Sequence, residues 1–370
     1  MMDAKIIQLE SRSKNCSDIG GRAEIDAQIA YHASRIGRFD LARNIIDRIR
    51  SEAELCHPPS VAIWIILAEG ILAYFEKLDI GSSDRFRRAH ALSAALSLND
   101  LRALSSAWLA HADFGLCKYD SMVNCINDCL FYNRAVGNLA SSRVGLVLAD
   151  SYLYSGDLAE SRRWYEAARQ SAILDGDRAT LGAIMYNRAA VALARYRVDH
   201  CLSLPHVLNA DVLSGAVLSA SSFHTLTSNK VLNQLQRMCE ARLAMIEDRF
   251  DVAVEIFDSI REVESGSLAG VSDKFFGVEY TYCLVRLGRM TRSEFLCHDV
   301  DVGLAATLDC DDRVVFLSEL LSIYKEFAIR DLIPNTSELL KGAVSAYVDD
   351  TKRLQTALQG IVYSENKIDD

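Results

Sequence analysis

The chain has 370 residues, of which 50% are hydrophobic and only four are proline. This balance favours abundant buried helix and argues against long disordered segments. The formal net charge of −10 repels phosphate backbones and anionic lipid surfaces, so the composition disfavours nucleic acid and membranes as partners.

The first residues, as far as Asp18, lack the apolar core of a secretory signal. Ten cysteines are scattered along the chain without a CxxC pair, which is typical of reduced thiols. The longest apolar stretch, 61–75, contains Glu69 and is shorter than the roughly 20 residues of a membrane-spanning helix. We therefore predict a cytoplasmic protein in which residues 61–75 form a buried helix.

Small residues recur along the chain at a spacing near 40, each within a segment whose pattern predicts a helix. The gaps between them are 38, 42, 39, 40, 52 and 40 residues. The residues are Ala30, Ala68, Ala110, Ala149, Ala189, Ala241 and Thr281. A repeat of this length predicts stacked helix pairs, because one pair cannot bury its apolar face without neighbours on both sides.

The clearest copy of the repeat runs from Gly145 to Ala168. Ala149 is small enough for two helices to approach closely, Gly156 can end the first helix with a positive φ, and Tyr165 packs the second helix. The copy therefore predicts a helix, a tight turn and a second helix.

This order of large, small and aromatic residues around a glycine turn resembles the tetratricopeptide repeat. The period near 40 exceeds the standard length of about 34 residues. Lengthened repeats of this kind resemble the superhelix of MalT-like bacterial signalling regulators, and the similarity covers about residues 22–330. The resemblance implies an all-α fold, a TPR-like right-handed superhelix of about seven to eight antiparallel helix pairs.

Two segments depart from the regular spacing. Residues 203–229 are rich in serine and lie in the longest gap, so we expect an irregular insertion there, either a long loop or a short extra helix. Pro334 stops one helix and begins the next. We therefore expect the solenoid to occupy residues 1–332. A capping helix as far as about Tyr363 and a polar tail should occupy 333–370.

Motifs that carry chemistry are absent from the sequence. It has no P-loop, no GxGxxG after a strand and no GxSxG, so we predict that the protein is not an enzyme. His200 and Cys201 are neighbours that point about 100° apart on a helix, which favours packing over joint chemistry. Cys125 and Cys129 share a helical face but lack further ligands nearby. We expect neither a cofactor nor a metal site.

The resemblance also implies where a partner would bind. In tetratricopeptide arrays the first helix of each pair lines a concave groove, and fixed offsets from the small residue give the positions that face it. Tyrosine and arginine are common there, and both are frequent at binding hot spots. The predicted partner-binding residues are His111, Arg143, Asp150, Tyr154, Tyr186, Asn187, Arg242 and Tyr282. The alternative is that Tyr186, like Tyr152, only fills space between helices, and that Arg143 pairs with Asp150 across two helical turns without any gain in binding.

The sequence leaves two functions open. One is a protein-protein interaction module, an adaptor or regulator that binds a partner protein or peptide in the concave groove. The other is a sensor domain that binds a small molecule or a short signalling peptide inside the superhelix. A homodimer formed through the C-terminal helix also stays open. The two-carboxylate clamp of chaperone-binding repeats is not supported, because only Asn187 fits its pattern.

Overall fold

The computed structural model describes residues 4–52, 57–77, 82–133, 139–206, 209–227, 232–262, 273–297 and 300–362. These ranges contain seventeen α-helices, one 3₁₀ helix and no strand, which confirms the all-α prediction. The helices are α1 (Ala4–Asn15), α2 (Ile19–Arg35), α3 (Phe39–Ser51), α4 (Pro59–Lys77), α5 (Ser82–Ala95), α6 (Asn99–Gly115), α7 (Tyr119–Tyr132), α8 (Leu139–Ser155), α9 (Leu158–Asp175), α10 (Arg178–Cys201), α11 (Ala210–Thr227), α12 (Asn233–Ile246), α13 (Phe250–Glu262), α14 (Asp273–Arg286), α15 (Arg292–Cys297), η1 (Val302–Thr307), α16 (Cys310–Glu326) and α17 (Ile333–Leu358).

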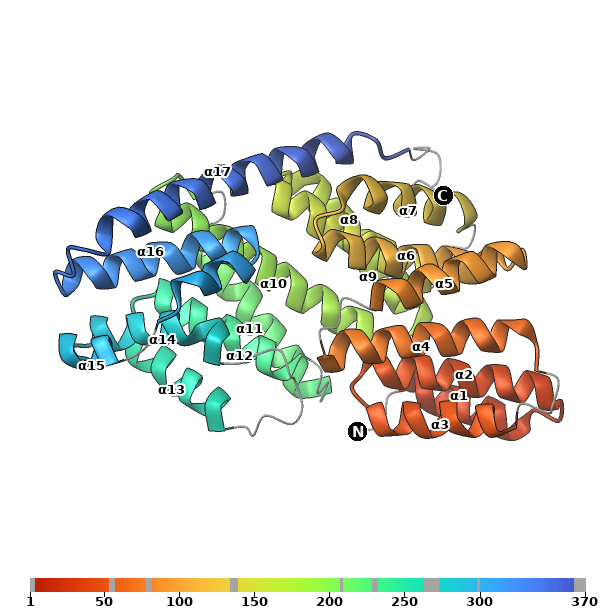
Figure 1. The fold of residues 1–370 in the computed structure, drawn as a ribbon. Helices are drawn as coiled ribbons and strands as arrows, with labels where there is room; N and C mark the ends of the chain where they lie inside the picture. The colour runs from red at the N-terminus through yellow and green to blue at the C-terminus, as the bar shows by residue number, and fades with distance from the viewer. Residues whose placement is uncertain are drawn as a thin grey trace.

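The seven small repeat residues lie one each in the even-numbered helices from α2 to α14. All seven are buried, with at most 4% of their surface exposed. Their small side chains let the even-numbered helices approach their neighbours closely. Consecutive helices from α1 to α14 contact one another, so the chain is a packed helical array (Figure 1).

The apolar stretch 61–75 lies within α4, as predicted. Ile63, Leu67 and Ile71 recur at helical spacing and are fully buried. Among the described residues, none of the helices combines the length and the apolar character that crossing a membrane requires.

The turn between α8 and α9 has the geometry that the sequence predicts. Gly156 has a φ of +95°, and Asp157 caps α9 by accepting a hydrogen bond from the Glu160 amide at 3.1 Å. A residue with a Cβ would be strained at this φ. A Cβ at position 156 would also lie 2.8 Å from the Arg195 guanidinium. The positive φ is therefore the main reason for glycine where α8 ends, because the Arg195 guanidinium is the end of a flexible side chain and can shift.

Helix α10 has 24 residues, and its two ends serve different parts of the array. In Figure 1, α1–α9 lie on one side of α10 and α11–α16 on the other. Asp177, just before α10, pairs with Arg35 of α2, while Arg197 near its end pairs with Glu319 of α16. We call the even-numbered helices α2 to α10 the first curve of the array, and α10 to α16 the second curve. The far end of each curve contacts α10 again through one of these two pairs.

Most of the segment 203–229, expected to be an irregular insertion, forms α11, which packs on α10 and α12. Leu213, Val217 and Ala220 recur at helical spacing and are buried. Ser214 and Ser219 lie between those apolar positions, so the segment forms an amphipathic helix rather than a long loop.

The last helix, α17, joins the two halves of the array (Figure 1). Its first half packs on α16, where Tyr347 belongs to the core, and its second half contacts α7 and α8, where Leu354 is fully buried. The Tyr119 hydroxyl of α7 donates a hydrogen bond to the Asp350 carboxylate at 2.5 Å. The helix ends at Leu358, and the expected end near Tyr363 lies outside the described residues.

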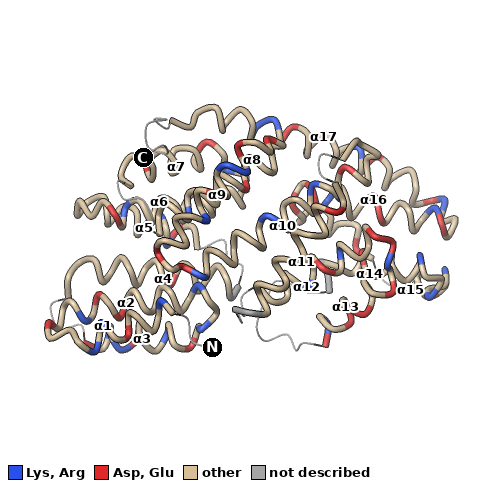
Figure 2. Tube along the Cα trace, turned by 180° about the vertical axis from the view of Figure 1, so that it is seen from behind, with Lys and Arg blue, Asp and Glu red and all other residues tan. Residues whose placement is uncertain are grey.

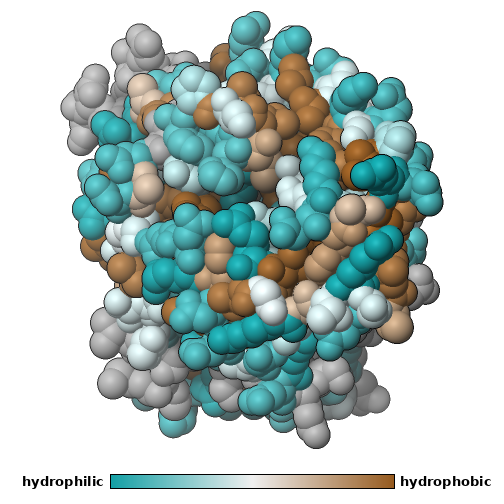
Figure 3. Space-filling model, turned by 90° about the vertical axis from the view of Figure 1, so that its left-hand side faces the viewer, coloured by the Kyte–Doolittle hydropathy of each residue, from teal (hydrophilic) through white to brown (hydrophobic). Residues whose placement is uncertain are grey.

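The end of the array formed by α13–α16 carries hydrophilic side chains between apolar ones (Figure 3). Leu296 is 56% exposed, and Leu332 and Leu339 are each 42% exposed. These residues come from α15 and the start of α17, so the apolar surface of this end is divided among several elements.

Candidate functional site

The eight predicted contact residues all lie on even-numbered helices, from α6 to α14. Arg143 and Asp150 are buried, with 5% and 3% of their surface exposed, and the other six are half-buried. Arg242 and Tyr282 line a pocket in the second half of the array. The structure therefore brings Arg242 and Tyr282 together at one pocket and buries Arg143 and Asp150 outside it.

Asp150 is the centre of one set of predicted residues. Its carboxylate accepts hydrogen bonds of 2.6 Å from the Tyr165 hydroxyl and from the Asn187 side-chain amide. Burial raises the pKa of Asp150 to about 7. Two of the predicted contact residues, Asp150 and Asn187, are thus partners of each other.

His111 lies against the indole of Trp108, with an edge-to-face distance of 5.8 Å between ring centres. Its Nε2 is 3.2 Å from the Tyr74 hydroxyl, and its Nδ1 is buried without a hydrogen-bond partner. Burial and the charge of Arg143 lower the pKa of His111 to about 3, so the imidazole is neutral at pH 7.

Tyr154 and Tyr186 are packed among neighbouring helices. The Tyr154 ring meets Phe114 of α6 and Tyr347 of α17 edge to face. Burial raises the pKa of both tyrosines, so neither hydroxyl ionises near neutral pH.

A chain of polar and aromatic side chains links the start of α10 to α2, α6 and α8. We call it the arginine cluster, and it consists of Asp177, Arg35, Tyr31, Trp108 and Arg143. Asp177 caps α10 by accepting a hydrogen bond from the Thr180 amide at 3.0 Å. Its other oxygen accepts from the Arg35 guanidinium at 2.8 Å. One carboxylate therefore both begins α10 and neutralises Arg35.

Aromatic rings continue the arginine cluster. The Arg35 guanidinium lies 5.4 Å from the Tyr31 ring centre, and the Tyr31 hydroxyl accepts a hydrogen bond of 2.9 Å from the Trp108 indole. The Arg143 guanidinium lies over Trp108 at 3.9 Å from its ring centre. This cation–π contact holds the guanidinium of Arg143 in place.

The arginine cluster carries more positive than negative charge. Although burial opposes its ionisation, Arg35 holds the pKa of Asp177 below its usual range. Burial and the charge of Arg35 lower the pKa of Arg143 to about 10, so Arg143 stays charged at pH 7. The Nε of Arg143 is buried without a partner, and its guanidinium forms no hydrogen bond or ion pair with a described residue. One guanidinium of this cluster thus lacks a counter-ion.

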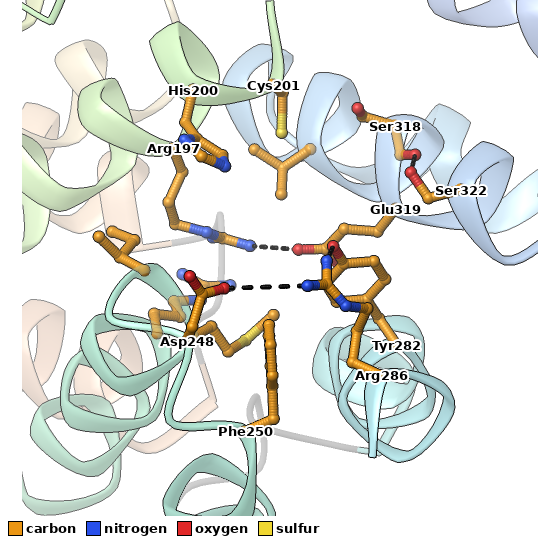
Figure 4. A pocket seen from close by; sticks show the side chains of 14 residues that line it. Arg197, His200, Cys201, Asp248, Phe250, Tyr282, Arg286, Ser318, Glu319 and Ser322 are labelled. Atoms are coloured by element: carbon orange, nitrogen blue, oxygen red, sulfur yellow. Dashed lines mark hydrogen bonds and ion pairs between the residues drawn. The ribbon is translucent and has the colours of Figure 1, made fainter. Parts of the chain in front are cut away.

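A cavity of about 260 Å³ lies between α10, α12, α14 and α16 (Figure 4). We call it the C-terminal pocket, and its lining includes Arg197, Cys201, Arg242, Tyr282, Ser318 and Glu319. Figure 4 shows that Arg197 from α10 and Glu319 from α16 point toward each other across it. The pocket is enclosed because α16, at the end of the second curve, packs against α10.

Buried ion pairs form one side of the C-terminal pocket. Arg197 pairs with Glu279 and lies 3.6 Å from Glu319. Arg242 pairs with Glu279 at 3.0 Å and with Asp312 at 3.4 Å. With three acids and two arginines, the network carries one negative charge too many if every group is ionised.

Protonation of Glu319 removes this excess negative charge. Glu319 is 8% exposed, and its Oε2 is buried without a hydrogen-bond partner. Burial and the neighbouring Glu279 raise the pKa of Glu319 to about 8, so the carboxyl is mainly protonated at pH 7. The pocket thus contains a neutral carboxyl that can ionise or form a new hydrogen bond.

The mouth of the pocket carries both charge and aromatic rings. Arg286 donates a hydrogen bond of 2.9 Å to the Tyr282 hydroxyl, and its guanidinium lies 4.8 Å from the Phe250 ring centre. Asp248 is 4.0 Å from Arg286, and the two side chains are 79% and 48% exposed. The mouth is therefore open to solvent and polar at its rim.

The described residues contain neither an ionised thiol at the pocket nor a cluster of metal-binding side chains. Burial raises the pKa of the Cys201 thiol to about 11, so it is not a thiolate at pH 7. In the described ranges, no group of three or more His, Cys, Asp or Glu side chains could hold a metal ion.

Most of the charged residues of the arginine cluster and the C-terminal pocket were not predicted from the sequence. Arg35 and Asp177 are 142 positions apart, and Arg197 and Glu279 are 82 apart, so no local pattern relates them. Charged side chains on the inner faces of predicted helices were the only available signal, as with Glu319. Figure 2 shows acidic and basic segments meeting between α10 and α16.

The chain matches no model of a protein family and no curated protein. Its class therefore rests on the structure: an all-helical array whose inner helices enclose a charged pocket.

Proposed function

We propose that the protein is a regulatory ligand-binding module, in which a small molecule or a short peptide occupies the C-terminal pocket. The observation that carries the proposal is the cavity of about 260 Å³ with convergent charged and aromatic groups. Ligand sites are commonly concave, with a few polar groups that fix orientation. Arg242 and Tyr282, both predicted from repeat offsets, line this cavity.

Burial supports the proposed sensor function over the adaptor function. A partner protein in a wide groove would have to contact Asp150, which is 3% exposed. Asp150 already bonds to Tyr165 and Asn187. A small ligand needs only the pocket, whereas a groove partner needs the interior to open.

The proposal takes the array to be a tetratricopeptide-like right-handed superhelix of about seven to eight helix pairs that acts in the cytoplasm. Its support is the placement of the seven small repeat residues on alternate helices. In such an array, a ligand that contacts both α10 and α16 would favour the conformation in which these two helices lie together. Binding would therefore change the surface that the array presents to a partner.

Thermal-shift screening against metabolites and short peptides tests the proposed function. A ligand at 100 times its dissociation constant adds about 2.7 kcal/mol to stability. We expect one chemical class to raise the Tm of the wild-type protein. Ser318→Phe, which fills the cavity, should abolish that rise, whereas Glu326→Gln on the exposed face of α16 should preserve it. A flat response to the whole set, or an unchanged rise in Ser318→Phe, contradicts the proposal.

A further inference from the structure

We propose that Arg143 binds an oxyanion, the carboxylate or phosphate group of a ligand, at the arginine cluster. This site lies among α2, α6, α8 and the start of α10, apart from the C-terminal pocket. It goes beyond the proposed function and rests on different residues. Its basis is a buried guanidinium without a counter-ion.

Among the described residues, no acid forms an ion pair or hydrogen bond with Arg143, although the charges of Asp177 and Asp150 act on it from a distance. Asp177 is engaged by Arg35, and the two oxygens of Asp150 are engaged by Tyr165 and Asn187. A buried lysine can escape such a position by losing its proton, but a guanidinium keeps its charge at pH 7. Buried charges in folded proteins are normally paired, because an isolated one is costly. The missing partner is an anion.

The geometry of Arg143 selects the kind of anion. The Arg143 Cζ lies 3.9 Å from the Trp108 ring centre. The N–H donors of a guanidinium lie in its own plane. Two parallel N–H donors match the two oxygens of a carboxylate or phosphate. The site therefore favours an oxyanion over a spherical ion.

A second donor group borders the same indole. When the Tyr74 hydroxyl donates to Nε2 of His111, the neutral ring carries its proton on Nδ1, which is buried without a partner. His111 and Tyr74 are half-buried, so this part of the interior retains contact with solvent. Arg143 and His111 thus both offer donors next to the Trp108 ring, and no described acid forms an ion pair with Arg143.

The test uses the full chain and two probes, inorganic phosphate and acetate, titrated at constant ionic strength against sodium chloride. Tryptophan fluorescence reports on Trp108, and thermal unfolding reports on stability. We expect a saturable fluorescence change and a rise in Tm with at least one probe. The probe that responds distinguishes a phosphate site from a carboxylate site.

Variants separate an anion site from a purely structural arginine. Arg143→Gln should lose the saturable response and, in chloride alone, should have a Tm at least as high as the wild-type protein. Arg188→Gln, an exposed arginine of α10, should keep the response. Arg143→Lys keeps the charge without the planar donors and should bind at least tenfold more weakly, which decides the matter if Arg143→Gln does not fold.

The proposal is overturned if the wild-type protein gives no saturable response to either probe, or if Arg143→Lys responds as the wild-type protein does. Ser318→Phe should leave this response unchanged, because it alters only the C-terminal pocket. Failure of the proposed function and failure of the anion site are therefore distinguishable.

Discussion

Arg35 on α2 and Asp177 at the start of α10 form an ion pair of 2.8 Å between residues 142 positions apart. Their side chains are only 2% and 1% exposed. Asp177 also caps α10 through the Thr180 amide. This pair ties the first even-numbered helix to α10, so it closes the first curve of the array and positions the arginine cluster.

We expect Arg35→Ala to lower the free energy of unfolding by about 3–5 kcal/mol, because it leaves Asp177 buried without a cation. Urea denaturation measures the change. The matched control is Lys341→Ala, whose pair with Glu338 is exposed and should be worth no more than about 1 kcal/mol. If the two variants lose similar stability, the closing role of Arg35 is wrong. A double variant, Arg35→Met with Asp177→Asn, should recover part of the loss.

The sequence predicted the helical array because its signals are local. Ala149 and Gly156 report on helix contact and turn geometry within one repeat, and both were interpreted correctly. Other turns gave no such signal, since Cys117 and Asp248 adopt positive φ values of 53° and 55° without being glycine. Helix α11 is the extra helix that was one of the two forms expected for 203–229, but the serine-rich composition gave no indication of its length.

The candidate site was only partly predictable for a different reason. Offsets from the small residues found Arg242 and Tyr282, which lie within regular repeats. They could not find Glu319, because its contact with Arg197 depends on how strongly the array curves between α10 and α16. Curvature is the sum of many small packing angles, and no single residue pattern encodes it.

Gly156→Ala should destabilise the protein more than Gly176→Ala. Both glycines have positive φ, at +95° and +69°, but a Cβ at 156 meets Arg195 whereas a Cβ at 176 meets nothing within 4 Å. Backbone strain alone costs about 1 kcal/mol. The displaced Arg195 would also lose its hydrogen bond of 2.9 Å to the Tyr154 carbonyl. Equal losses in urea denaturation would show that the Arg195 contact contributes nothing.

Tyr119→Phe should lower stability by about 1–3 kcal/mol, because it removes the hydroxyl that donates to the buried Asp350 of α17. Hydrogen exchange in the second half of α17 should rise at the same time, since this bond joins α17 to α7. Lys352→Ala, on the exposed face of α17, is the control and should leave this exchange unchanged. No change in α17 exchange in Tyr119→Phe would contradict the joining role of α17.

Glu319 should make stability fall as pH rises. Its pKa is raised from 4.5 to about 8 by burial and Glu279, so the folded state holds a proton that the unfolded state releases above pH 4.5. The resulting stabilisation is fully present below pH 4.5 and is lost as pH rises through 8. Between these values the contribution changes by up to about 1.4 kcal/mol per pH unit.

Glu319→Gln removes this proton linkage while keeping the shape of the protonated side chain. Unfolding free energies of the variant should therefore fall less steeply between pH 5 and pH 8 than those of the wild-type protein. Some slope remains, because burial also raises the pKa of Asp150 to about 7 and gives that carboxyl the same sign of dependence. Glu326→Gln on the exposed face of α16 should keep the wild-type slope. Parallel profiles for the wild-type protein and Glu319→Gln would mean that Glu319 is ionised in the folded state, and that Arg197 and Arg242 outweigh its burial.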